Sequence, residues 1–164
     1  VATRVGVASG LVAHYEPSMD DLVATTFARI VADELAEVEQ LIAFEDDPVA
    51  ALRQLLHTLL DPERGDVTLV WVQAWALGGR NSALAETVRV QMDAWERFIA
   101  SVVTRAAPTA AEDASAMARQ ILGMTDGLNA HSLVGRHDDT ERYDLLTRSV
   151  EAMLSLPTGA LRST

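Results

Sequence analysis

Cysteine and lysine are both missing from this sequence of 164 residues, and long apolar runs are missing too. Without cysteine the chain forms neither disulfides nor thiolate metal sites. No apolar run approaches the roughly 20 residues of a membrane-spanning helix, so we expect no contact with a membrane. No secretory signal opens the chain, and we expect a cytoplasmic protein. The first residue is Val1 rather than Met, which leads us to expect that upstream residues are missing.

Negative charges outnumber positive ones in this chain, and they are unevenly distributed. The sequence has 13 arginines and 24 acidic residues, which gives a net charge of −11. Most of the chain is therefore excluded as a nucleic-acid surface, because phosphate neutralisation needs a basic footprint. Residues 1–15 are different, since they contain Arg4 and His14 and no acid, whereas the chain is acidic from Glu16 onward. This asymmetry separates a possible DNA-facing front from a body that would repel DNA.

The apolar content and its periodicity predict a helical globular fold. Apolar residues make up 49% of the sequence, which is typical of a folded chain. Strand signals are nearly absent, because the β-branched stretch 67–72 runs directly into a helical pattern. Six helices are predicted from caps, Pro and Gly. The first three cover residues 18–42, 47–60 and 66–79, with caps at Ser18 and Asp47. The fourth begins at Asn81 or Ser82 and ends near residue 106, the fifth covers residues 109–135 with a cap formed by Thr109 and Glu112, and the sixth begins within residues 138–140 and ends before Pro157. In the first of them, Leu22, Phe27, Ile30, Val31 and Val38 belong to one apolar face. The tail after Pro157 is expected to be frayed.

Residues 2–22 have the shape of a helix-turn-helix. The pattern predicts the end of one helix, a turn at Gly6, a short helix over residues 8–15, a turn at Pro17, and then the long helix. In a helix-turn-helix the N-terminal part of the second helix enters the major groove of DNA. The same residues could instead be a helical hairpin within a bundle, but the Gly-Val turn, the Ser18 cap and the acid-free front together favour the DNA-binding interpretation.

This segment resembles the TetR family of transcriptional regulators. The matching positions are Gly6, Val7, Gly10, His14, Tyr15, Ser18 and Leu22. A local similarity follows at Asp126-Gly127-Leu128. The resemblance implies an all-α, TetR-like fold, with a partial helix-turn-helix head and connecting helix in residues 1–42. A helical-bundle ligand-binding and dimerisation domain would occupy residues 43–164. The family's head has three helices, so the chain is N-terminally truncated on this interpretation and needs the missing residues to bind operator DNA.

The resemblance also assigns candidate DNA contacts. The groove-facing and backbone-facing positions would be Thr3, Ser9, Gly10, Leu11, Ala13, His14 and Tyr15. Four positions depart from the family pattern, namely Ala8 for Ser, Ala13 for Tyr, Glu16 for an aromatic or aliphatic residue and Met19 for Lys. Each change removes a cap, a contact or a cation, or adds a carboxylate near phosphates. We therefore expect weak or unusual DNA contact.

Aromatic residues and methionines in the body predict a small-molecule site. Trp71 and Trp75 are one helical turn apart, and small-molecule pockets are mostly apolar with a few polar groups. Such stripes are also common in ordinary hydrophobic cores. For any one of these residues taken alone, a place in the core is the favoured interpretation. For the set, the family resemblance favours a pocket for an apolar or aromatic effector rather than a polyanion. The candidate ligand-binding residues are Trp71, Trp75, Met92, Trp95, Met124 and Asn129, with Gln73, Asp126 and His131 as further polar groups.

Small residues in the last two helices predict a close helix contact. Ala114, Ala118, Gly123, Gly127 and Ala130 allow another helix to approach, either within the chain or from a second copy, and their spacing does not decide between these. For a homodimer through the helices at 109–135 and 138–156, the candidate interface residues are Gly123, Gly127, Ala130, Leu145, Val150 and Leu154.

These observations favour a ligand-responsive transcriptional regulator, most simply a repressor, that binds operator DNA as a homodimer and is released by a small effector. No enzyme motif is present: the four histidines are scattered and no Glu-x-x-His, phosphate loop or Gly-x-Ser-x-Gly occurs. No catalytic residue, cofactor or metal site is predicted, since His131 and His137 near Asp138 and Asp139 fit a solvated helix cap better. His57 is expected to be partly buried. The alternative is a helical dimeric interaction or small-molecule-binding module without DNA binding.

Overall fold

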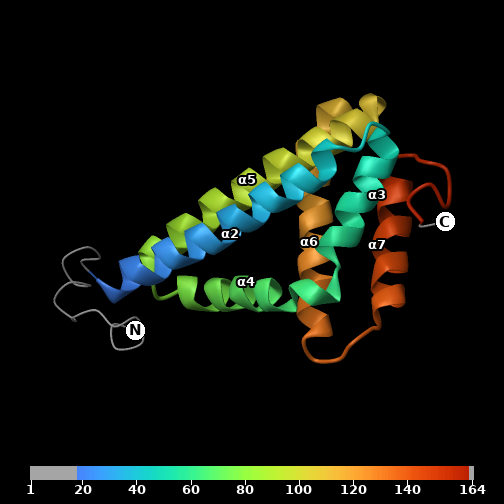
Figure 1. Ribbon diagram of the computed structural model, residues 1–164. Coiled ribbons are helices and arrows are strands. Elements are labelled where there is room, and N and C mark those ends of the chain that lie inside the picture. The colour runs from blue at the N-terminus through green and yellow to red at the C-terminus, as the bar shows by residue number, and fades with distance from the viewer. Residues whose placement is uncertain (1–17, 163–164) are drawn as a thin grey trace.

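The computed structural model describes residues 18–162, and these residues form helices joined by short turns (Figure 1). The all-α prediction is confirmed for this part of the chain. None of its helices is both long enough and apolar enough to cross a membrane. Two short 3₁₀ helices, η1 (Pro62–Arg64) and η2 (Pro108–Asp113), connect the main elements, which are α2 (Met19–Ala43), α3 (Pro48–Leu59), α4 (Gly65–Gly78), α5 (Ser82–Ala106), α6 (Ala114–Ser132) and α7 (Asp139–Met153).

Side-chain caps begin four of these helices where the sequence predicts them. Ser18, Asp47, Asn81 and Asp138 each accept a hydrogen bond from a backbone N–H of the first turn, at 2.8–3.0 Å. Such caps satisfy donors that have no partner inside the helix. The predicted cap at Thr109 is wrong: residues 108–113 form η2, and α6 begins at Ala114 without a side-chain cap.

The two longest helices, α2 and α5, run side by side in the same direction (Figure 1). Their N-terminal ends are joined where Asn81 Nδ2 donates a hydrogen bond to the carbonyl oxygen of Asp20, at 3.2 Å. Helix α4 returns beneath this pair, and α3, α6 and α7 stand across the other end of the molecule. Helix α5 packs against α2, α3, α4 and α6, so it is the central element of the bundle.

Helix α2 belongs to the same hydrophobic core as the helices that follow it. Phe27, Val31, Val38 and Ile42 are buried in that core together with side chains of every other α-helix. Ile30 is exposed, so its expected place on the buried face is wrong. The division between residues 1–42 and 43–164 therefore stays a prediction about roles, because the packing is continuous across residue 42.

The C-terminal tail is ordered by hydrogen bonds as far as residue 162, and the expectation of fraying is wrong there. The buried carboxylate of Glu151 accepts bonds from the backbone N–H groups of Gly159 and Leu161, at 3.0 and 2.9 Å. Tyr143 Oη donates to the carbonyl oxygen of Leu161 at 2.7 Å. Leu161 itself is fully buried. The turn after α7 is thus packed against the helix by a charged acceptor that the sequence analysis overlooked.

The predicted DNA contacts lie outside the described residues. This applies to Thr3, Ser9, Gly10, Leu11, Ala13, His14 and Tyr15. The described chain begins at the Ser18 cap of α2, so the helix-turn-helix stays a prediction from the sequence.

Candidate ligand-binding site

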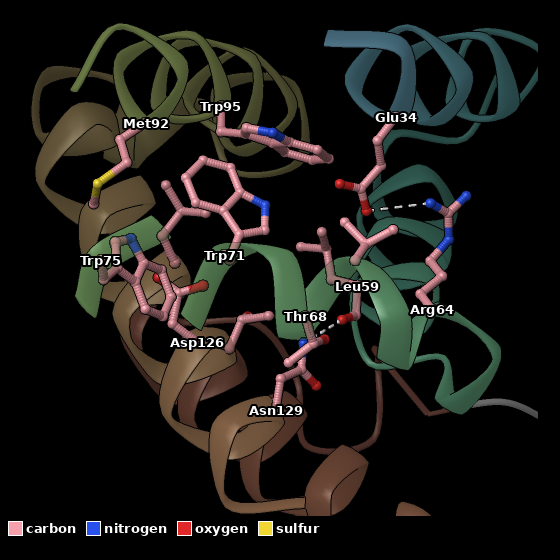
Figure 2. A pocket seen from close by; sticks show the side chains of 13 residues that line it. Glu34, Leu59, Arg64, Thr68, Trp71, Trp75, Met92, Trp95, Asp126 and Asn129 are labelled. Atoms are coloured by element: carbon pink, nitrogen blue, oxygen red, sulfur yellow. Dashed lines mark hydrogen bonds and ion pairs between the residues drawn. The ribbon is translucent and has the colours of Figure 1, made fainter. Parts of the chain in front are cut away.

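A cavity of about 60 Å³, partly open to solvent, lies where α2, α4, α5 and α6 converge (Figure 2). The end of α3 and η1 complete its wall. Its lining is mainly apolar, with two carboxylates and one guanidinium. The lining residues are Glu34, Leu59, Arg64, Val67, Thr68, Trp71, Trp75, Met92, Trp95, Leu122, Thr125, Asp126 and Asn129.

Three tryptophan rings form much of the wall. Trp71 and Trp75 follow one another on α4, with ring centroids 5.9 Å apart and a 37° angle between the ring planes. Phe27 of α2 packs edge-on against Trp71, with the two ring centroids 5.1 Å apart, and this contact supports the Trp71 ring. Trp95 of α5 is buried, and its indole Nε1 has no hydrogen-bond partner. Figure 2 shows the Trp71 and Trp95 rings facing the same space from α4 and α5.

An acidic pair with one shared arginine forms the α2 side of the cavity. Arg64 of η1 contacts Glu34 Oε1 at 3.3 Å and Glu37 Oε1 at 3.2 Å. The second oxygen of Glu34, Oε2, is buried and has no partner. Burial raises the pKa of Glu34, and the adjacent Arg64 charge opposes that effect. Figure 2 shows the carboxylate of Glu34 extending from α2 toward the cavity, with Arg64 on one side.

Helix α6 contributes a polar row to the opposite side. Thr125 is buried and its Oγ1 has no partner. The next residue, Asp126, forms no hydrogen bond or ion pair with the described residues, and burial raises its pKa to about 6. Polar groups left without partners in such a site recover binding free energy when a ligand supplies the missing hydrogen bonds. The arrangement is therefore suited to holding a mainly apolar molecule by a few polar contacts.

Asn129, one turn further along α6, connects the cavity to the rest of the bundle. Its Nδ2 donates to the carbonyl oxygen of Leu59 at 2.8 Å, and its Oδ1 accepts from Arg142 of α7 at 2.8 Å. Arg142 is buried and also donates to the carbonyl oxygen of Leu60 at 3.1 Å and to Asp139. These bonds join the end of α3, the cavity wall and α7 at one point.

The cavity brings together most of the predicted ligand-binding residues. Trp71, Trp75, Met92, Trp95 and Asn129 line it, together with Asp126, whereas Met124 packs against the core and is not part of the lining. Gln73 and His131 are exposed and lie outside it, and His57 is also exposed rather than partly buried. Glu34, Arg64 and Thr125 were missed. Glu34 and Arg64 resemble other surface charges in the sequence, and only the meeting of α2 with η1 reveals them.

The residues predicted to form the dimer interface differ in how far they are buried within their own chain. Val150 and Leu154 are 0% and 3% exposed within their own chain, so the prediction that they contact a second copy does not agree with their packing. Gly123 and Leu145 are exposed, and Gly127 and Ala130 are half-buried. A methyl group added at Gly123 or Gly127 would meet nothing within 4 Å. Packing within the chain therefore does not require a small residue at either glycine.

Comparison with known proteins gives two matches. Residues 48–155, more than half of the chain, match the model of the BetI-type transcriptional repressor C-terminal domain. The fold is similar to a crystal structure from Rhodococcus sp. RHA1, which was described as that of a proposed transcriptional regulator. That match has a TM-score of 0.76 and 14% sequence identity, and covers 99% of this chain and 85% of the other. No curated protein matches the sequence.

Proposed function

The chain belongs to the TetR family of transcriptional regulators, in the group with a BetI-type repressor C-terminal domain, and we propose that it is a ligand-responsive repressor. On this proposal it binds operator DNA as a homodimer and releases the DNA when a small apolar or aromatic effector binds. The observation that carries the proposal is the tryptophan-lined cavity, in which buried polar atoms lack partners.

The unpartnered atoms support a binding role for the cavity. Among the described residues, five buried side-chain atoms have no hydrogen-bond partner, and three of them belong to cavity residues: Glu34 Oε2, Trp95 Nε1 and Thr125 Oγ1. A buried polar atom without a partner costs about 1–3 kcal/mol. This concentration in one place supports a binding role, because a ligand that reaches these atoms would complete their hydrogen bonds.

Helix α2 offers a route from the cavity to DNA. Glu34 lies in the cavity wall, and the same helix begins at Ser18, directly after the predicted recognition segment. A ligand that changes the Glu34–Arg64 contact would shift α2 relative to α4 and α5. In a dimer such a shift changes the spacing of two recognition helices, which must match one DNA turn of roughly 34–36 Å. A coupling free energy of about 1–3 kcal/mol is sufficient for regulation.

The exposed face of α6 and α7 supports the homodimer. Gly123 and Gly127 leave space on α6 that no other part of the described chain fills, and Leu145 presents an apolar side chain on α7. Helices with small residues at their contact can pack closely against a second copy. We expect Gly123→Glu to convert a dimer to a monomer in native mass spectrometry with unchanged helix content. Gly79→Glu is the matched control, because that glycine also faces open space. A monomeric parent protein would overturn the dimer.

The sensor role is tested by DNA affinity. Ligands are first identified by thermal shift, and an operator is selected from random DNA with the full-length protein. A cavity ligand should then weaken DNA binding at least about fivefold in fluorescence anisotropy. Trp75→Ala should remove the response, whereas Leu77→Ala, an exposed position on the same helix outside the cavity, should retain it. Unchanged DNA affinity with every ligand that binds would remove the sensor claim.

A further inference from the structure

The cavity carries more negative than positive charge. Its lining contains two carboxylates, Glu34 and Asp126, and one cation, Arg64. Arg64 is already shared between Glu34 and Glu37, at 3.3 and 3.2 Å. The described residues therefore offer no cation to Asp126. A ligand with a positive charge would supply the partner that this carboxylate lacks.

Asp126 shares the cavity with an aromatic surface. Asp126 and Trp75 both line it, and Figure 2 shows them across the cavity from Glu34. Trp71 follows at a ring distance of 5.9 Å, and its ring is supported by Phe27. Tryptophan is the aromatic side chain that attracts a cation most strongly, and the attraction increases when water is excluded. A carboxylate without a partner, in a cavity lined by indole rings, is thus a combination that favours an organic cation.

We propose that the cavity binds a protonated organic amine with an apolar body. Its ammonium group would lie against the Asp126 carboxylate and the Trp75 ring, and its body would lie among Trp71, Trp95 and Leu122. The proposal rests on the sensor function proposed above and names the chemical class of its effector. It also makes the predicted preference for an apolar or aromatic effector more specific, because that preference leaves the charge of the effector open.

The hydrogen-bonding groups distinguish a protonated amine from other ligands. Asp126 is an acceptor, and an ammonium N–H can donate to its carboxylate, whereas a quaternary ammonium cannot. The Thr125 hydroxyl has no partner and can accept another N–H. An anionic ligand would meet two carboxylates and only one arginine, which is already paired. A neutral ligand would leave Asp126 desolvated and without a counter-charge, which is costly for an ionised carboxylate.

The ionisation of Asp126 gives the proposal a pH signature. Burial raises the pKa of Asp126 to about 6, so the free cavity has an ionised Asp126 at neutral pH and a protonated one in mild acid. The other charged groups facing the cavity are Glu34 on α2 and Arg64 on η1, with Asp66 of α4 acting on Glu34. The lining residues from α3 and α5 carry no charge. Amine affinity should therefore be highest above pH 6 and fall about tenfold by pH 5.

Calorimetry with a matched ligand series tests the proposal. The probes are phenylbutylamine, phenylbutanol, phenylbutyrate and trimethyl(phenylbutyl)ammonium, which share one apolar body. We expect the primary amine to bind about tenfold or more tightly than the alcohol, the quaternary ammonium to bind more weakly than the primary amine, and the carboxylate not to bind. Asp126→Asn should reduce amine affinity to that of the alcohol and abolish the pH dependence. Asp46→Asn, an exposed loop carboxylate outside the cavity, should change neither.

The remaining outcomes distinguish a failure of the amine proposal from a failure of the sensor function. Preferential binding of the alcohol or the carboxylate, or no binding of the amine at millimolar concentration, overturns the amine proposal and leaves the sensor function open to another ligand class. An amine that binds with the expected pH dependence but leaves DNA affinity unchanged supports the site and overturns the sensor function. If Asp126→Asn fails to fold, the amine-to-alcohol ratio and its pH dependence in the parent protein decide the question.

Discussion

Two regions of the bundle hold charged side chains that are wholly or partly buried, and they differ in how those charges are partnered. In the cavity, Asp126 has no partner among the described residues and one oxygen of Glu34 is free. At the C-terminal junction, which we define as Arg142, Glu151 and their hydrogen-bond partners, both charges are less than 5% exposed and both bind backbone groups, and only Arg142 Nε has no partner among the described residues. The junction connects α3, α6, α7 and the tail, whereas the cavity lies where α2, α4, α5 and α6 converge.

The difference agrees with the ligand-binding role that we propose for the cavity and with a structural role for the junction. A buried charge that is hydrogen-bonded on several sides holds its neighbours in place, and removing it leaves those neighbours without partners. A buried charge without partners lowers stability and is tolerated where a ligand uses it. Substitutions should therefore destabilise the protein at the junction and leave it equal or more stable in the cavity.

The largest expected effect is at Arg142. Arg142→Met removes the donor to Leu60 O and to Asn129 Oδ1, so two acceptors that are buried or half-buried are left unpaired. We expect the free energy of unfolding to fall by about 3–5 kcal/mol in urea titrations, because each unpaired acceptor costs about 1–3 kcal/mol. Arg148→Met on the same helix is the control, because Arg148 is exposed and should change stability by less than about 0.5 kcal/mol. Equal losses for the two variants would contradict the junction's role.

Glu151→Ala should have the next largest effect. The substitution removes the acceptor for Gly159 N–H and Leu161 N–H, and the tail that buries Leu161 should detach. We expect a loss of about 2–3 kcal/mol and faster proteolysis after residue 155. Glu151→Gln keeps one acceptor oxygen and should lose less. A tail that remains protected in Glu151→Ala would show that the apolar contacts of Leu161 are sufficient.

Asp126→Asn should change stability in the opposite direction. The pKa of Asp126 is raised from its ordinary value of 3.8 to about 6 in the folded chain, so the folded state holds its proton more tightly than the unfolded state. Stability therefore decreases as pH rises from about 4 to about 6, and stays at the lower value above that range. At pH 7 we expect Asp126→Asn to gain about 2 kcal/mol in thermal or urea unfolding. A loss at pH 7 would mean that Asp126 has a structural partner.

The smallest expected changes in the free energy of unfolding are at two buried threonines, one with a hydrogen-bond partner and one without. Thr147 Oγ1 donates to the carbonyl oxygen of Tyr143 at 2.8 Å, whereas Thr125 Oγ1 has no partner. Thr147→Val should lose about 1 kcal/mol in urea unfolding, because a hydrogen bond disappears. Thr125→Val should be neutral or gain up to about 1 kcal/mol, because a desolvated hydroxyl is replaced by a methyl group. If both valine variants lose the same amount, the distinction between the two regions does not extend to hydroxyl groups.

The fold could be predicted largely because its signals are local. Capping side chains determine helix starts within a few residues of sequence. The predicted caps at Ser18 and Asp47 are confirmed, and the structure uses Asn81 and Asp138 among the alternatives that the sequence left open. Thr109 shows the limit of such signals. Its spacing to Glu112 fits a cap, but the chain forms η2 after Pro108 and delays α6 by five residues. The packed tail was missed because Glu151 and Leu161 meet only when the chain reverses after α7.

The cavity could be predicted only in part, for the same reason. Trp71, Trp75 and Trp95 are rare large residues, and their types alone suggested a ligand site. Glu34, Arg64 and Thr125 are common residue types whose importance depends on which helices meet. The absence of partners around Asp126 is likewise a property of three-dimensional packing. Residue type therefore indicated the apolar wall, whereas the charge inside it required the structure.

The hydrogen bond from Asn81 to the carbonyl oxygen of Asp20 has a mechanical consequence for α2. Glu34 lies 14 residues beyond that anchor, a distance of about 21 Å along a helix. We expect this anchor to restrain the first turn of α2, so that a sideways displacement at Glu34 rotates the helix rather than sliding it along its axis. The direction of the first turn, at Ser18, would then change more than its position.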